Sequence, residues 1–236
     1  MPKKENVREM FDAIAPDYDR LNHIMSMNVD RGWRRRALRR IVDTTGPLEV
    51  LDLACGTGDF SLAIARRMVR REVSGHVAGV DLSEGMLAVM REKVAAAGLQ
   101  ERISVAQGDG EALPFPDGTF DRVTIAFGIR NFEDRAAGLR EMLRVLKPGG
   151  RLVILELSVP GNRILRWLYN LYFLHILPRI GGRISGDRAA YNYLPASVLK
   201  FPGRKAFSAE LAAVGFRSIH HRAFTLGICR MYTGEK

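Results

Sequence analysis

The sequence predicts an α/β fold in which a doubly wound, mostly parallel sheet of seven strands forms a single domain over residues 1–236. Three observations favour this fold. Apolar, strand-like segments alternate with amphipathic, helix-like segments between residues 48 and 157, the order that builds a parallel sheet. The segment at 48–54 is nearly all apolar, as a strand buried on both faces should be. A glycine-rich turn follows at 56–58, where doubly wound sheets bind their ligands.

The central region supplies five of the expected strands. Ser83 and Asp134 are suited to cap helices with their side-chain oxygens, and Gly98 is suited to end one. The Pro-Gly-Gly segment at 148–150 predicts a turn after a helix that ends at Lys147. The expected strands lie at 48–54, 77–81, 102–107, 121–127 and 151–157, and the expected helices at 60–70, 83–97 and 134–147.

The N-terminal region is expected to be a helical lid over residues 1–47. Apolar residues at i, i+3, i+4 and i+7 from Val7 to Ile14 predict one helix, and a second is expected at 31–42. The C-terminal region is expected to begin with a helical insertion at 158–207. A helix at 208–214 and strands at 216–222 and 226–233 should follow, and their short connection requires an antiparallel strand pair.

The turn after the first strand points to a cationic nucleoside. Gly56 and Gly58 let the backbone approach a ligand closely, but the third glycine of the dinucleotide-binding pattern is missing. Asp52 and Asp59 flank this turn and would repel a pyrophosphate. S-adenosylmethionine carries an ammonium and a sulfonium and no phosphate, so we predict it as the cosubstrate.

Two further acids follow successive strands. Asp81 ends the second strand, where a carboxylate can accept hydrogen bonds from two ribose hydroxyls. Asp109, with Gly110, follows the third strand and can receive the adenine amino group. Each acid alone is more often a turn residue than a ligand. Together with Asp52, however, they place three carboxylates at three successive strand ends, which favours a binding site.

This arrangement resembles the Rossmann-like class I methyltransferases. A narrower resemblance, to the ubiquinone/menaquinone biosynthesis C-methyltransferase family, covers nearly the whole chain. The similar segments are FDAIAPDYD at 11–19, NHIMS at 22–26, EALPF at 111–115, FGIRN at 127–131, LPRIG at 177–181, and Tyr191 with Leu194.

The resemblance implies an enzyme that transfers a methyl group from S-adenosylmethionine to a ring carbon of a polyprenylated quinol precursor. The resemblance does not distinguish a naphthoquinol from a benzoquinol acceptor. The short N-terminal segment favours the naphthoquinol, the acceptor in menaquinone biosynthesis. It implies cosubstrate contacts at Thr57, Asp81, Asp109 and Gly110. With the turn, the expected binding set is Asp52, Gly56, Thr57, Gly58, Asp81, Asp109 and Gly110.

Methyl transfer to carbon needs alignment, a route for the ring-hydroxyl proton, and charge complementarity to the phenolate. Arg130 and Asn131 follow the fourth strand. We expect Arg130 to stabilise the phenolate and Asn131 to orient the quinol oxygen. Tyr18 and His23 on the N-terminal segment are candidates to close over the site, and His23 has an ordinary pKa near neutrality. Simple lid packing is the alternative for both.

The basic charge is concentrated near the C-terminus. The net charge is +10, and residues 158–236 hold twelve Lys/Arg but only three Asp/Glu. Within the insertion, a dense apolar helix at 162–178 is flanked by arginines, which suits an anionic membrane surface where a prenyl tail resides. We therefore expect a cytoplasmic protein, peripheral at the inner face of the membrane. A cap helix packed on the domain is the alternative interpretation, and both can hold.

Other functions remain open from the sequence. A methyltransferase of another small molecule or of RNA could use the basic C-terminal third, although its many aliphatic residues argue against nucleic acid, and no nucleic-acid partner is expected. The missing glycine disfavours a nicotinamide oxidoreductase, and the acidic set disfavours a non-catalytic module. Cys55 and Cys229 lie far apart, so neither a disulfide framework nor a metal site is expected. A homodimer is compatible with the sequence.

Overall fold

The computed structural model of the protein describes residues 3–19, 28–172 and 188–236. The strands are β1 (Leu48–Leu53), β2 (Gly75–Asp81), β3 (Ile103–Gln107), β4 (Phe120–Ala126), β5 (Leu146–Leu157), β6 (Arg217–Phe224) and β7 (Cys229–Glu235). They form one seven-stranded sheet in the order β3-β2-β1-β4-β5-β7-β6. Strands β1 to β5 pair in parallel, and β7 is antiparallel to both β5 and β6. The predicted doubly wound sheet and its antiparallel last pair are confirmed.

The strand order reverses between β1 and β4. From β1 the chain runs outward through β2 and β3, and then returns to pair β4 with the other side of β1. Leu53, the last residue of β1, is level with Val80 of β2 and Ile125 of β4. The carboxyl ends of these three strands therefore meet at one edge, which is where ligands bind in this type of sheet.

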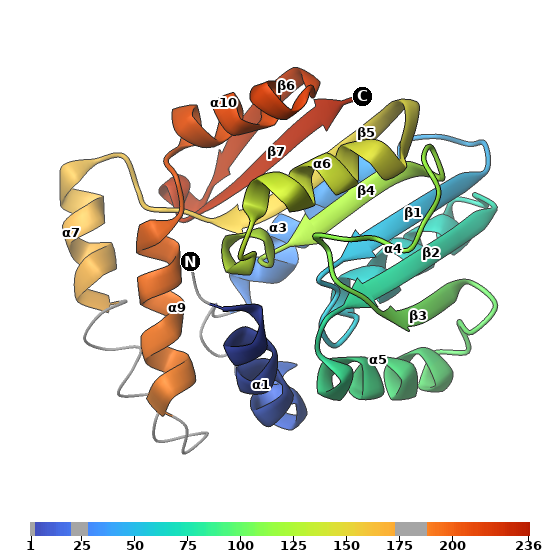
Figure 1. The fold of residues 1–236 in the computed structure, drawn as a ribbon, viewed down its shortest axis with the longest axis horizontal. Helices are drawn as coiled ribbons and strands as arrows, with labels where there is room; N and C mark the ends of the chain where they lie inside the picture. Colours follow the sequence, from blue (N-terminus) through green and yellow to red (C-terminus); the bar gives the residue numbers. More distant parts are fainter. Residues whose placement is uncertain (1–2, 20–27, 173–187) are drawn as a thin grey trace.

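Helices cover both faces of the sheet (Figure 1). One face is covered by α3 (Val29–Ile41), α4 (Asp59–Arg70) and α5 (Glu84–Ala96), and the other by α6 (Arg135–Val145) and α10 (Arg204–Val214). The predicted caps are confirmed. The Ser83 hydroxyl accepts a hydrogen bond from the Met86 amide (3.1 Å), and the Asp134 carboxylate accepts one from the Ala137 amide (2.9 Å).

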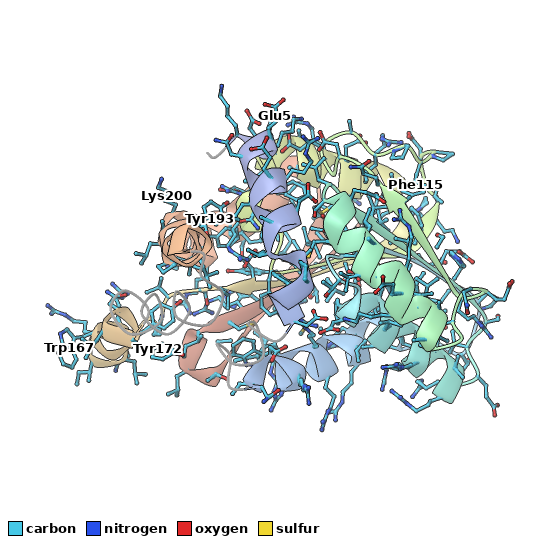
Figure 2. The ribbon with its side chains drawn as sticks, turned by 90° about the horizontal axis from the view of Figure 1, so that it is seen from below. Glu5, Phe115, Trp167, Tyr172, Tyr193 and Lys200 are labelled. Carbon is cyan, nitrogen blue, oxygen red and sulfur yellow. The ribbon has the colours of Figure 1, made fainter. Side chains whose placement is uncertain are left out.

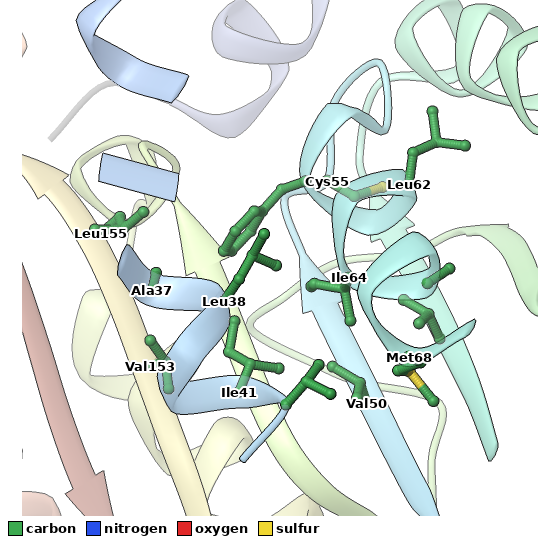
Figure 3. Close-up of a cluster of buried hydrophobic side chains, with 14 of the residues drawn as sticks. Ala37, Leu38, Ile41, Val50, Cys55, Leu62, Ile64, Met68, Val153 and Leu155 are labelled. Atoms are coloured by element: carbon green, nitrogen blue, oxygen red, sulfur yellow. The ribbon is translucent and has the colours of Figure 1, made fainter. Parts of the chain in front are cut away.

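Apolar side chains from the strands build a core on each side. Successive strand residues point to opposite faces, so Val153 of β5 joins the core under α3 and α4, while its neighbour Ile154 joins the core under α6 and α10. Figure 3 shows Ile41 of α3 and Ile64 of α4 gathered around Val50 of β1. These helices fix the rigid frame from which the site residues project.

The remaining elements lie beyond the carboxyl ends of the parallel strands. They are α1 (Lys4–Ile14), η1 (Ala15–Asp17), η2 (Ile129–Asn131), α7 (Arg163–Leu171), α9 (Arg188–Lys200) and η4 (Thr225–Gly227). Figure 1 shows α1 and α9 at the end of the sheet toward which β1 and β4 point, with α7 farther out. The predicted N-terminal helices and helical insertion are confirmed where the structure describes them. The LPRIG segment and the end of the expected 162–178 helix lie outside the described residues.

One predicted turn is wrong. Helix α6 ends at Val145 and β5 begins at Leu146, so the Pro-Gly-Gly segment lies within a long strand. Leu146 pairs with Phe120 of β4, and the register shifts before Arg151. Gly149 takes a φ of 74°, a left-handed conformation that glycine adopts without strain. The segment is therefore an irregularity within the β-ladder rather than a break before it.

Candidate active site

A cavity lies at the carboxyl ends of β1, β2 and β4, where the strand order reverses. The turn after β1, the end of β2 and the segments after β3 and β4 form its walls, and α1 contributes residues from the N-terminal region. Of the residues predicted from the sequence, those that line the cavity are Tyr18, Gly56, Asp81, Asp109, Gly110 and Asn131.

The glycine turn and Asp81 are joined by backbone hydrogen bonds. The Gly56 amide donates to Asp81 Oδ2 (2.8 Å), and the Ser83 amide donates to Oδ1 (2.9 Å). Gly56 and Gly58 have φ of 56° and 81°, and a Cβ at Gly58 would overlap the Met90 side chain. Each Asp81 oxygen keeps a lone pair that can accept a hydroxyl. Burial raises the pKa of Asp81, so a bound cation would favour its charged form.

Asp52 is not among the residues that line the cavity. Its side chain is 1% exposed and accepts a hydrogen bond from the Ser61 hydroxyl (2.5 Å). Burial raises the pKa of Asp52 to about 7, against the effect of the Ser61 hydrogen bond and the Arg34 charge. Asp52 can therefore act on a ligand through its charge, which depends on pH, and not by direct contact.

The second acid that flanks the turn is already paired. The Asp59 carboxylate bridges Arg34 (3.1 Å) and Lys93. Lys93 also contacts Asp19 Oδ2 (2.7 Å), whose other oxygen accepts from the Thr57 hydroxyl (2.5 Å). Thr57 is buried and does not line the cavity. The repulsion of phosphate expected from Asp52 and Asp59 together is thus weaker than the sequence indicated, whereas Asp81 and Asp109 line the cavity directly.

Asp109 meets a residue of the N-terminal helix. Lys4 Nζ lies 2.7 Å from Asp109 Oδ2 and 3.9 Å from Glu111 Oε2. Burial alone would raise the pKa of Asp109, but the hydrogen bonds from Lys4 and from the Glu111 amide outweigh it and lower that pKa. In turn, the hydrogen bond to Asp109 and the charge of that carboxylate raise the pKa of Lys4. The carboxylate expected to bind adenine is therefore ionised and shared with α1.

A second contact holds α1 against α5. Asp12 Oδ1 accepts hydrogen bonds from the Ser83 hydroxyl (2.5 Å) and the Gly85 amide (2.9 Å). Negative charge at a helix N-terminus is favourable because the free backbone N–H groups point toward it. Asp12 and Asp19 together fasten the N-terminal segment beside the cavity, with Tyr18 between them on its wall.

Arg130 does not line the cavity. Its guanidinium is 6% exposed, and Nη1 lies 2.8 Å from Oε1 of Glu156, which is fully buried. The guanidinium also donates to the Phe127 carbonyl and to the Ser197 hydroxyl (3.3 Å). A buried charge needs such a partner, because an unpaired one is costly. The predicted contact between Arg130 and the phenolate remains a prediction, and this arrangement does not favour it.

Asn131 lines the cavity, and its side chain contacts the insertion. The hydroxyl of Tyr193, on α9, donates to Asn131 Oδ1 (2.9 Å). Figure 2 shows Tyr193 on the side of α9 that faces α1. His23, the fourth predicted catalytic residue, lies outside the described residues.

Among the residues at this site that the sequence did not predict are Lys4, Glu156 and Tyr193. Glu156 carried a usable signal, because a charged residue inside an apolar strand must find a buried partner. Lys4 and Tyr193 carried none, since their partners lie 105 and 62 residues away in the chain.

A mostly parallel seven-stranded sheet, with a cavity after β1 and β2 that carboxylates line, is typical of the class I S-adenosylmethionine-dependent methyltransferases. Within that class, the sequence model of the ubiE/COQ5 methyltransferase family matches residues 1–236. The chain belongs to this family.

Curated relatives agree with this assignment. The chain is 54% identical over 234 residues to the ubiquinone/menaquinone biosynthesis C-methyltransferase UbiE of Geobacter sulfurreducens, covering 99% of this chain and 90% of that protein. It is 44% identical to a demethylmenaquinone methyltransferase of Bacteroides fragilis, over 99% and 94% of the two chains. The predicted class of enzyme, a C-methyltransferase of quinone biosynthesis with S-adenosylmethionine as cosubstrate, is confirmed.

Solved structures support the fold. A putative S-adenosylmethionine-dependent methyltransferase of Methanococcus maripaludis has a TM-score of 0.66 at 20% identity, over 96% of this chain and 94% of that one. The [4+2]-cyclase SpnF has a TM-score of 0.73 at 18% identity, over 100% and 96%. A cyclase on this fold shows that the fold alone does not fix the reaction.

Proposed function

We propose that the protein methylates a ring carbon of a prenylated quinol, with demethylmenaquinol as the acceptor and menaquinol as the product. The observation that carries this proposal is the near-full-length similarity to proteins named for this reaction, at 44% to 54% identity. A benzoquinol precursor of ubiquinone is the second candidate, because several of these relatives are named for both pathways.

The cosubstrate is proposed to lie along the carboxyl ends of β1 to β3. Asp81 would accept from the ribose hydroxyls, and Asp109 with Gly110 would receive the adenine edge. Gly56 lets the backbone approach the ligand closely at its φ of 56°. Asp52 would contribute through its charge. These residues fit a cationic nucleoside, because Asp81 and Asp109 present carboxylates to the cavity without an adjacent phosphate-binding glycine pattern.

The acceptor ring is proposed to lie against η2. S-adenosylmethionine supplies an electrophilic methyl group, and the ring carbon becomes nucleophilic when the adjacent hydroxyl is deprotonated. Asn131 would donate a hydrogen bond to the resulting phenolate, a form of charge stabilisation that lowers the barrier. Tyr18 would close the site from the lid. Arg130 would act at a distance, by holding η2 against β5 through Glu156.

The protein is also proposed to bind the membrane surface through α7. Ile164, Trp167 and Leu171 lie on one face of this helix and are 72%, 63% and 42% exposed. Arg163 and Arg166 are exposed beside them. In Figure 2, Trp167 projects from the outer edge of the molecule. Such a face suits an anionic membrane interface, where a prenyl tail would also lie. No helix among the described residues is long and apolar enough to cross a membrane.

Incubation of the purified protein with methyl-labelled S-adenosylmethionine and each demethylated quinol tests the proposal. We expect label in the naphthoquinol product. Transfer only to the benzoquinol would move the assignment to the second candidate, and transfer to neither would refute a quinol acceptor.

A further inference from the structure

The insertion contacts the site through α9, at two points one helical turn apart. The Tyr193 hydroxyl donates to Asn131 Oδ1 (2.9 Å), and the Ser197 hydroxyl accepts from Arg130 Nε (3.3 Å). Residues 193 and 197 lie on the same face of the helix because they are four apart. The two consecutive residues of η2 are thus each held by the same face of α9.

These contacts determine what each η2 residue can offer an acceptor. Arg130 is committed to Glu156, the Phe127 carbonyl and Ser197, so its positive charge is neutralised within the protein. In the part of the chain that the structure describes, Asn131 is engaged at its carbonyl oxygen, by Tyr193. Among the described residues, none accepts a hydrogen bond from its amide nitrogen, and Asn131 lines the cavity.

A side-chain amide can present either its oxygen or its nitrogen, and its partners decide which. The Tyr193 hydroxyl engages the oxygen, which leaves the two amide N–H groups for a ligand. A phenolate needs donors, and an amide turned the other way would present a carbonyl oxygen and repel it. Burial raises the pKa of Tyr193, so its hydroxyl keeps the proton that it donates.

We propose that Tyr193 is a positioning residue that fixes the side-chain amide of Asn131 with its N–H groups toward the acceptor oxygen. This inference rests on the proposed quinol methylation. It also gives the insertion a part in the chemistry, since α9 orients a residue that contacts the reacting ring.

Steady-state kinetics of Tyr193→Phe, Asn131→Ala and the double variant test this role. We expect Y193F to lower kcat about 10-fold, the effect of losing one well-aligned hydrogen bond in the transition state. The Kd for S-adenosylmethionine should not change. If Tyr193 acts through Asn131, the double variant should be no slower than N131A.

The pH profile separates positioning from simple packing. If Y193F stabilises the phenolate less, the acceptor hydroxyl loses its proton at higher pH, so the rise of kcat with pH should move to higher pH. If the substitution only loosens α9, KM or the melting temperature should change without that shift. Tyr232→Phe is the matched control, because it removes a hydroxyl from a tyrosine that is 1% exposed in the sheet core. It should leave kcat and the profile unchanged.

The outcomes distinguish this inference from the proposed function. If the unmodified protein methylates neither quinol, the proposed function fails. If it does methylate one, but Y193F matches it in kcat and pH profile, or the two substitutions lower kcat independently, the positioning role of Tyr193 is refuted.

Discussion

Asp52 is a buried carboxyl group in the central strand, and its protonation links stability to pH. Burial raises the pKa of Asp52 to about 7, whereas an aspartate in the unfolded chain has a pKa of about 3.9. Between these two values the folded state holds a proton that the unfolded state has lost. The stabilisation is therefore complete below the unfolded pKa and is lost as the pH rises toward about 7.

Asp52→Asn should remove this dependence, because the amide is neutral at every pH. Between pH 4 and 7 we expect the free energy of unfolding of the unmodified protein to fall relative to that of D52N, by up to about 4 kcal/mol. Urea titrations across this range measure the difference. Parallel curves for the two proteins would show that Asp52 is ionised throughout.

Lys4 and the adenine amino group are proposed to share one carboxylate, Asp109. Lys4→Ala should therefore strengthen S-adenosylmethionine binding by about 3- to 10-fold. Added salt should reduce the difference in Kd between the variant and the unmodified protein, because it screens the half-exposed Lys4–Asp109 ion pair. Calorimetric titration at low and high salt measures both effects. Lys3→Ala, at the exposed residue before α1, is the matched control. Weaker binding by K4A would instead show that Lys4 supports the bound state.

At the scale of single elements, α7 is the part whose surface departs most from that of a packed helix. Trp167→Ser and Ile164→Ser should each weaken binding to vesicles that contain anionic lipid by about 10-fold or more, since each removes an apolar group worth about 1.5–3 kcal/mol on burial. Vesicle co-sedimentation measures the change.

Val69→Ser is the matched control for this experiment, because it alters an exposed apolar residue, 48% accessible, on α4. If W167S and I164S bind the vesicles as well as the unmodified protein does, α7 is a cap helix and the proposal that it binds the membrane surface is refuted.

The elements themselves were largely predictable from the sequence, while several contacts between them were not. The apolar run of β1, the caps at Ser83 and Asp134 and the acid after β2 are local patterns, and local patterns encode local structure. The start of β5 was missed because Pro-Gly-Gly usually ends elements, whereas here a buried Leu146 draws the segment into the sheet. The placement of Arg130 in η2 depended on Glu156 of β5, and only the fold brings the two side chains together.

At the scale of the whole molecule, the N-terminal segment and the internal insertion both lie at the edge of the sheet where β1, β2 and β4 end. The N-terminal segment is fastened by Asp12 to α5 and by Asp19 to Thr57 and Lys93, and the insertion contributes α9. When segments of this kind cover a bound ligand, they exclude water and strengthen the electrostatic interactions within the site. Cosubstrate binding should therefore depend on how firmly the N-terminal segment is held.

Asp19→Asn tests this dependence, because the amide loses the charge that pairs with Lys93. At 100 times its Kd, S-adenosylmethionine should stabilise the unmodified protein by about 2.7 kcal/mol and raise its melting temperature by about 5–10 °C. At the same ligand concentration, a 10-fold weaker Kd in D19N would reduce that shift to about half. Asp43→Asn removes the charge that pairs with Arg122 of β4 and Arg151 of β5, away from the cavity. It should lower the melting temperature but keep the full ligand-induced shift. An undiminished shift in D19N would mean that the anchored segment does not support cosubstrate binding.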